Sequence, residues 1–325
     1  MAVDPYEEGN MEAYISDIEF AVGERRELED LAGSIPEKRI SLFRKFGLKY
    51  YYEYNGSIYD IALEAAKKTV KGKEKDIEKL VFSTGSFHSP PSPYNRVDGI
   101  KDLNQLLKGL KIDAYPYGVF LSDCANIISA IRIGKDLLME EQIEDNLKQK
   151  SNNICIITSD VTGADESRVV PPGTSIKSDS ASSCIISSKP RKNSFRIGDI
   201  HQYHNKEMLG NTALSYEDYI IQVGKCIDFV RKKNLEEKNQ TFQHILTNNY
   251  SYSYIKTFSL SLLANEDIFY QEQIPNFAHC FSSDLLINLN QLCITRQLNH
   301  GDRILAIASG PSSISSICLE YIEQI

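Results

Sequence analysis

The sequence predicts an α/β protein that consists of two similar halves. Short apolar runs typical of buried strands, such as 80–85 and 153–160, alternate with longer segments that have the apolar spacing of helices. The order of helix, strand, polar turn, helix behind a Cys-bearing turn, and strand occurs at 58–160 and again at 216–310. Helices and strands that alternate in this way predict a mixed or parallel sheet whose faces are covered.

The first half is expected to cover 13–189, after an N-terminal segment, 1–12, that is polar, acidic and predicted to be flexible. Ser57 is a typical N-cap for the helix behind it, and Gly47 is expected to end an earlier helix. The strands are expected at 13–22, 49–54, 80–85, 153–160 and 184–188, and the helices at 24–32, 36–46, 58–70, 103–110 and from just after Cys124 to about 139.

The second half is expected to cover 190–325, because the segment 189–192 is basic and contains a proline that interrupts regular structure. Two apolar runs, 258–263 and 314–321, are assigned neither to a helix nor to a strand. Strands are expected at 195–200, 244–247 and 303–308, and helices at 216–233 and 283–297.

Composition and charge exclude several classes of function. The chain has 325 residues and a formal net charge of -8, which argues against nucleic-acid binding, since that requires a surplus of Lys and Arg. No apolar run approaches the roughly 20 residues that cross a bilayer, and the N-terminus does not resemble a secretory signal. The seven cysteines are scattered without a CxxC pair, which argues against a disulfide framework and against a structural metal site. We therefore expect a cytoplasmic protein without a metal and without a membrane partner.

The stretch 117–131 carries the main chemical signal. Its apolar run ends in a small polar turn that holds Cys124, and a helix is predicted directly behind this turn. A thiol at a helix N-terminus faces unpaired N–H groups, which are expected to lower its pKa and to favour the nucleophilic thiolate. The alternative is that Cys124 is an ordinary buried core cysteine. If the two halves pair their sheets, the turns of Cys124, Asn248 and His279 would lie at a shared interface.

Several landmarks in order along the chain carry a resemblance to a known family. The segments are Phe46-Gly47-Leu48, Asp76 to Val81, Asp123-Cys124-Ala125-Asn126, Ser178-Asp179-Ser180-Ala181 and Gly301 to Leu305. Over about 13–320 the chain resembles the β-ketoacyl-ACP synthase III branch of the thiolase superfamily. This resemblance implies a thiolase-like fold, in which two pseudo-duplicated βαβαβ halves form a layered αβαβα architecture. It also implies a homodimer and an acyl group carried on a cysteine, which is Cys124 here.

The resemblance also shows departures at the site. The family's catalytic His position is occupied by Asn248 and its Asn position by His279, so the two polar roles are exchanged or one is lost. Without the resemblance, His279 would be interpreted as a core or capping histidine; with it, His279 is the expected base. Asn248 is a further candidate catalytic residue, with a structural role in its turn as the alternative. The family's oxyanion hole implies the backbone N–H groups of Cys124 and of Ser312, because Pro311 has no N–H to donate.

The donor of the acyl group is expected to be a thioester, with no bound cofactor. Relatives that use coenzyme A often stack its adenine on a Trp where this chain has Ser41, and the chain contains no Trp. A phosphopantetheine arm on an acyl carrier protein is therefore favoured over coenzyme A, although Phe43 could stack instead. His88, near the predicted entrance, and Asn249 are further candidates for substrate binding.

These observations predict an acyltransferase that loads Cys124 from a carrier-protein or coenzyme A thioester. It would pass the acyl group to a hydroxyl, amine or carbon nucleophile of a small molecule, in specialised metabolism related to polyketides or fatty acids. Because the His and Asn positions used in condensation are exchanged here, a hydroxyl or an amine is favoured as the acceptor over a carbon nucleophile. Two alternatives stay open: a decarboxylative β-ketoacyl synthase III, and a non-catalytic partner subunit of an active relative.

Overall fold

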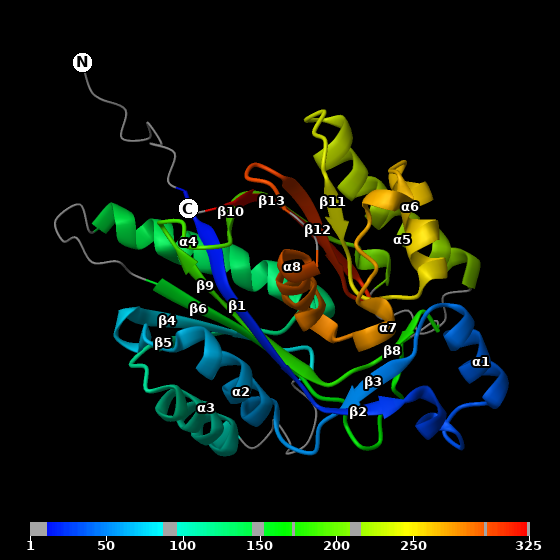
Figure 1. Cartoon of the computed structure of the whole chain (residues 1–325), viewed down its shortest axis with the longest axis horizontal. Helices are drawn as coiled ribbons and strands as arrows, with labels where there is room; N and C mark the ends of the chain where they lie inside the picture. Colours follow the sequence, from blue (N-terminus) through cyan, green and yellow to red (C-terminus); the bar gives the residue numbers. More distant parts are fainter. Residues whose placement is uncertain are drawn as a thin grey trace.

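The computed structural model describes residues 12–86, 96–144, 153–170, 173–208, 216–295 and 298–323. Within these residues the largest feature is a mixed sheet with the strand order β11-β12-β13-β10-β1-β9-β6-β4-β5 (Figure 1). Its strands are β1 (Tyr14–Val22), β4 (Ile77–Ser83), β5 (Tyr115–Val119), β6 (Asn153–Asp160), β9 (Ser180–Ser187), β10 (Ser194–His204), β11 (His244–Leu246), β12 (Arg303–Ser309) and β13 (Ser313–Ile322).

The topology of this sheet repeats, as the sequence pattern predicts. In the first half β4 and β6 are parallel, whereas β6–β9 and β9–β1 are antiparallel. In the second half β11 and β12 are parallel, whereas β12–β13 and β13–β10 are antiparallel. A short antiparallel contact joins β1 to β10 at Tyr14 and Ile15. The division of the chain at 189–190 stays a prediction.

Helices form three layers around the two halves of the sheet (Figure 1). Helices α4 and α8 lie between the halves, α2 and α3 cover the first half, and α5 and α6 cover the second. The bounds are α1 (Glu37–Lys45), α2 (Ile58–Val70), α3 (Arg96–Leu110), α4 (Asn126–Glu144), α5 (Tyr216–Arg231), α6 (Tyr252–Leu262), α7 (Ile274–Phe277) and α8 (Asp284–Thr295). None of the described helices combines the length and the apolar character that crossing a bilayer requires.

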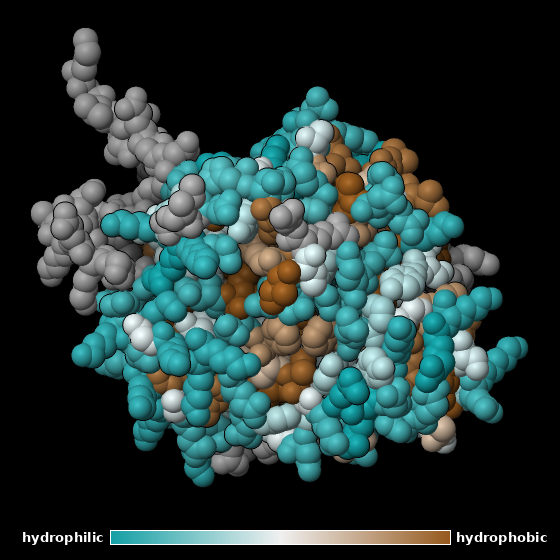
Figure 2. All heavy atoms as spheres, in the orientation of Figure 1, coloured by the Kyte–Doolittle hydropathy of each residue, from teal (hydrophilic) through white to brown (hydrophobic). Residues whose placement is uncertain are grey.

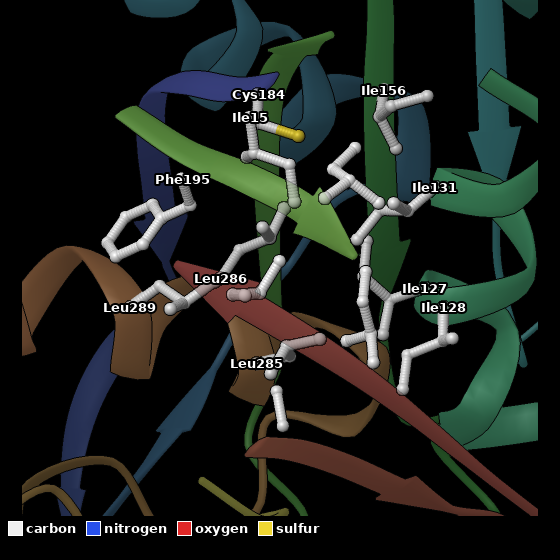
Figure 3. Close-up of a cluster of buried hydrophobic side chains, with 14 of the residues drawn as sticks. Ile15, Ile127, Ile128, Ile131, Ile156, Cys184, Phe195, Leu285, Leu286 and Leu289 are labelled. Carbon is white, nitrogen blue, oxygen red and sulfur yellow. The ribbon is translucent and has the colours of Figure 1, made fainter. Parts of the chain in front are cut away.

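The middle layer holds the core on which the site is built. In Figure 3, side chains of α4 and α8 meet side chains of the strands on both sides. The labelled members are buried and comprise Ile15, Ile127, Ile128, Ile131, Ile156, Cys184, Phe195, Leu285, Leu286 and Leu289. Burial of this apolar surface on folding fixes α4 and α8 in place, and each of these helices begins next to the candidate site.

Most predicted elements are confirmed, and one is wrong. Helix α2 has the expected bounds, and Ser57 Oγ accepts a hydrogen bond from Asp60 N at its first turn. The predicted helix at 24–32 is instead the strand β2 (Glu24–Glu27) followed by a 3-10 turn, Leu28–Leu31. Strand β2 pairs with β3 (Tyr50–Glu53), and this pairing between distant segments outweighs the local helical pattern. The unassigned runs form α6 and β13, and β9 begins earlier than expected.

Gly134 tests how tightly α4 packs on the sheet. A Cβ at this buried position would lie 2.8 Å from Ile186 Cδ1 and 2.9 Å from Ile156 Cδ1. Overpacking costs typically 1–3 kcal/mol, whereas Ala in place of Gly gains about 1 kcal/mol of helix propensity. We expect Gly134→Ala to lower the melting temperature by a few degrees in a thermal melt.

Gly224 of α5 provides the matched control for this prediction. It is exposed, and beyond its chain neighbours and the backbone of its own helix no atom of the described residues lies within 4 Å of the place that its Cβ would occupy. Gly224→Ala should therefore keep only the gain in helix propensity and raise the melting temperature slightly. Equal shifts for the two variants would contradict the close packing of α4 against β6 and β9.

Candidate active site

The turn that carries Cys124 is fixed by contacts from several elements. A 3-10 turn, Asp123–Ala125, leads directly into α4. The Asn126 side chain accepts a hydrogen bond from Ser122 N at 2.8 Å and donates one to Thr84 O at 3.0 Å. Ser282 Oγ donates to Asp123 O, and Ser313 Oγ donates to Ser122 O. Both of these serines come from the second half, so the turn is held from across the interface between the halves.

Cys124, His279 and Asp284 form a continuous chain of polar contacts. Cys124 Sγ lies 3.2 Å from His279 Nε2, and His279 Nδ1 lies 2.5 Å from Asp284 Oδ2. All three residues are buried. An ionised carboxylate only accepts hydrogen bonds, so the proton of a neutral imidazole belongs on Nδ1. The lone pair of Nε2 then faces the sulfur, which is the arrangement of a base beside a nucleophile.

Asp284 is itself held by backbone donors. Its Oδ1 accepts from Cys280 N at 2.7 Å, and its Oδ2 accepts from Asn249 N at 2.9 Å. These bonds fix the carboxylate, and the carboxylate fixes the orientation of the His279 ring. The ring also packs between Tyr250 and Phe281, with centroid distances of 5.1 and 5.6 Å.

The electrostatics of Cys124 differ from the sequence prediction. Burial raises the pKa of the Cys124 thiol well above its usual range, and the charges of Asp123, Asp160 and Asp284 raise it further. The predicted lowering by the helix N-terminus is therefore wrong for this site, because desolvation and three nearby carboxylates outweigh the helix dipole. The raised pKa favours the thiol form of Cys124. Formation of the thiolate therefore requires a proton acceptor, and His279 Nε2 lies 3.2 Å from the sulfur.

A cavity of about 400 Å³ opens onto this pair. Its wall includes Asp123, Cys124 and His279 together with residues of the turn at 309–313. Helices α5 and α6 contribute mainly apolar side chains to the wall, namely Val223, Cys226, Ile227, Tyr254 and Phe258. A cavity lined by both a thiol and apolar side chains suits a substrate with a hydrocarbon segment.

Helices α5 and α6 also carry apolar residues on the outside of the molecule. The face in Figure 2 is mainly hydrophilic, with hydrophobic residues at its centre, near its lower edge and on the side where these two helices lie. The large exposed hydrophobic residues described in this region are Ile220, Ile221, Tyr252, Leu260 and Leu263.

Asn248 is near the site, but its amide is already engaged. Its Oδ1 accepts from Ser309 N at 2.8 Å, and its Nδ2 donates to Phe281 O at 3.3 Å. The residue is buried and is not part of the cavity wall. The sequence predicts a catalytic group at this position. The Asn248 side chain instead binds the backbone of the turn at Ser309 and does not line the cavity.

The other predicted site residues lie at different distances from the cavity. Ser309, Gly310, Pro311 and Ser313 belong to its wall, but Ser312 does not, and the Ser312 carbonyl accepts from Asn205 N. His88 lies outside the described residues.

Phe43 and Asn249 are placed in the interior and not in the cavity wall. Phe43 is 1% exposed and packs in the core cluster under α5 and α6. Asn249 is buried, and its Oδ1 accepts from Asn288 Nδ2 at 3.0 Å. Their side chains therefore pack against the protein itself, where the sequence interpretation expects contact with a substrate.

Three residues of the site are missing from the sequence interpretation. Asp284 is the second residue of the predicted helix 283–297, where an acidic residue is ordinarily explained by the helix dipole. Its spacing of five from His279 was available as a signal. Asp123 precedes Cys124 directly and lines the cavity. Tyr250 joins the site through tertiary packing alone, and its hydroxyl donates to Ser309 O at 3.1 Å.

Comparisons with known proteins agree with the fold. Neither the family models nor the curated protein sequences include a match to this chain. Among solved structures, ChlB3, described as an acyltransferase, is 17% identical with a TM-score of 0.76 and covers 96% of this chain and 98% of its own. The 3-oxoacyl-[acyl-carrier-protein] synthase III of Aquifex aeolicus is 15% identical with a TM-score of 0.70 and covers 95% and 100%. AbyA1, a tetronic acid condensing enzyme, is 13% identical with a TM-score of 0.72 and covers 95% and 99%. The chain has the thiolase-like fold of these condensing and acyl-transferring proteins.

Proposed function

We propose that this chain is an acyltransferase that works through a thioester on Cys124. The observation that carries the proposal is the buried triad Cys124, His279 and Asp284, of which Cys124 and His279 line a cavity. In the first step His279 Nε2 takes the thiol proton, Cys124 Sγ attacks the carbonyl carbon of a donor thioester, and the released donor thiol receives the proton. In the second step Nε2 takes a proton from the acceptor, which attacks the acyl carbon, and Cys124 leaves as a thiol.

The residues around Cys124 have separate roles in the proposed mechanism. Asp284 keeps the proton on Nδ1 and stabilises the imidazolium that forms during each step. The Cys124 N–H remains the proposed donor to the oxyanion of the tetrahedral intermediate, whereas Ser312 lies outside the cavity wall and is not assigned this role.

The geometry favours transfer to a hydroxyl or an amine over decarboxylative condensation. Condensation requires two donors on one enolate oxygen, and the Asn248 amide is committed to Ser309 N and Phe281 O. Three carboxylates near Cys124 would also repel the free carboxylate of a malonyl group. The description of ChlB3 as an acyltransferase supports the same choice.

The proposed donor is a carrier-protein or coenzyme A thioester, and the proposed assembly is a homodimer. The absence of Trp from the sequence favours the carrier protein. Strand β5 forms one edge of the large sheet, and Tyr115, Phe120 and Leu121 near it are 68%, 47% and 85% exposed. An open edge with exposed apolar side chains suits pairing with a second copy.

Intact-mass spectrometry tests the proposal. The protein is incubated with acyl thioesters on coenzyme A and on a carrier protein, beside the variant Cys124→Ala. We expect an increase in mass equal to one acyl group, absent from the variant, because only a nucleophile at 124 can form the thioester. Release of CO₂ from a malonyl thioester would support the condensing alternative. No mass increase with any donor would overturn the proposal and favour a non-catalytic partner subunit.

A further inference from the structure

A carboxylate stands directly beside the proposed nucleophile. Asp123 lines the cavity, and its Oδ1 lies 3.5 Å from Cys124 Sγ. In the part of the chain that the structure describes, no Lys, Arg or His forms an ion pair with it. The neighbouring Gly85 leaves room for this group, because a Cβ there would lie 2.6 Å from Asp123 Oδ1. The mechanism proposed above does not use this charge.

The backbone holds this carboxylate in place. Asp123 has a φ of 50°, a left-handed conformation that is costly for a residue with a side chain. The conformation is maintained by the hydrogen bond from Ser282 Oγ to Asp123 O at 3.0 Å and by the adjacent bond from Ser313 Oγ to Ser122 O at 3.1 Å. The side chain is therefore preorganised at the wall of the cavity.

The site around Asp123 is negatively charged. Asp160 is fully buried, and its Oδ1 accepts hydrogen bonds from donors at 84–86. Its Oδ2 has no hydrogen-bond partner among the described residues. Burial raises the pKa of Asp160 to about 6, and the nearby charge of Asp123 contributes to this rise. The cation in the cavity wall, Lys177, is paired with Glu166 at 3.4 Å. Carboxylates beside a thiol disfavour the thiolate. A positively charged ligand would be stabilised by these carboxylates and would offset their unfavourable effect on the thiolate.

We propose that the acceptor is a primary amine, which binds as an ammonium ion to the Asp123 carboxylate. This inference rests on the acyltransferase function proposed above and names its acceptor class. Asp123 takes one proton from the ammonium and leaves a neutral amine beside the acyl carbon. The amine nitrogen attacks this carbon, His279 Nε2 takes the second proton, and the C–S bond to Cys124 breaks. The products are an amide, the Cys124 thiol that receives the proton from Nε2, and one proton released from Asp123 to solvent.

The test compares matched acceptors on the loaded enzyme. Wild type is loaded with a butyryl group from its N-acetylcysteamine thioester and then supplied with hexylamine, 1-hexanol or hexanoate. Deacylation is followed by intact mass, and the amide or ester is quantified by chromatography with mass detection. We expect hexylamine to react fastest, and Asp123→Asn to lower the amine-to-alcohol rate ratio at least 10-fold.

Two controls separate this effect from damage to the site. Asp113→Asn makes the same chemical change at an exposed position and should leave the ratio unchanged. Iodoacetamide should alkylate Cys124 of Asp123→Asn at least as fast as in wild type, since removal of the nearby negative charge lowers the pKa of the thiol.

A calorimetric titration with hexylamine provides a readout that does not need acylation. Unloaded wild type should bind hexylamine at least 10-fold more tightly than Asp123→Asn does. Failure to form any acyl-enzyme, with Asp123-dependent binding of hexylamine retained, would overturn the proposed function alone. A normal acyl-enzyme that prefers the alcohol, or an amine preference unchanged in Asp123→Asn, would overturn the amine acceptor alone.

Discussion

Replacement of His279 by alanine is expected to slow acylation of Cys124 by about 10² to 10⁴-fold at neutral pH. His279 Nε2 is the base within 3.2 Å of the sulfur, and burial together with nearby carboxylates raises the pKa of the thiol. Without the imidazole, only the small fraction of thiolate at a given pH can attack. The rate is measured as acyl-enzyme formation by intact mass after short incubations with a saturating thioester.

The dependence on pH distinguishes this role from a structural one. Since the pKa of Cys124 is raised, the thiolate fraction of His279→Ala grows tenfold with each pH unit below that pKa, and acylation should grow with it. Wild type should show a weaker dependence over the same range, because Nε2 removes the proton locally. His244→Ala is a suitable control, as this residue begins β11 and is not part of the cavity wall. A rate for His279→Ala within a factor of a few of wild type would contradict the assignment of the base.

Asp284→Asn is expected to lower the acylation rate by roughly 10³ to 10⁴-fold, although the two side chains have nearly the same size. Both carboxylate oxygens accept hydrogen bonds, from Cys280 N on one side and from His279 Nδ1 and Asn249 N on the other. An amide places an NH₂ group opposite one set of these donors. If the NH₂ faces His279, the ring proton moves to Nε2, and the base loses the lone pair that faces Cys124.

Nitrogen NMR of protein labelled in histidine is the measurement that checks this cause. In wild type the signals should identify Nδ1 as the protonated nitrogen of His279, and in Asp284→Asn the fraction with the proton on Nε2 should rise. Asp267→Asn, in an exposed turn before α7, makes the same change without touching the site. A slow variant that keeps the wild-type tautomer would assign Asp284 a role in stabilising the imidazolium rather than in orienting the ring.

The sequence contains enough to predict the fold and the proximity of Cys124 and His279, but not the contacts that complete the site. Local patterns define α2, and the family resemblance brings Cys124 and His279 together although they are 155 positions apart. The strand β2 is missed because its partner β3 lies in a later segment, and pairing decides its structure. The engagement of the Asn248 amide depends on Ser309, 61 positions away, and no local pattern encodes that bond. Side-chain contacts across the interface between the halves are set by packing of the whole chain.

The turn of Cys124 comes from one half of the molecule, whereas the serines that anchor it, the base and the orienting carboxylate come from the other. A chain in which only one half has folded would therefore carry a cysteine without its proton acceptor. Reactivity toward thioesters would emerge only after the halves have docked. The same step buries the core cluster that contains Ile127 of α4 and Leu286 of α8. If the proposed function holds, a first half that leaves the ribosome ahead of the second would not react with thioesters until the second half has folded against it.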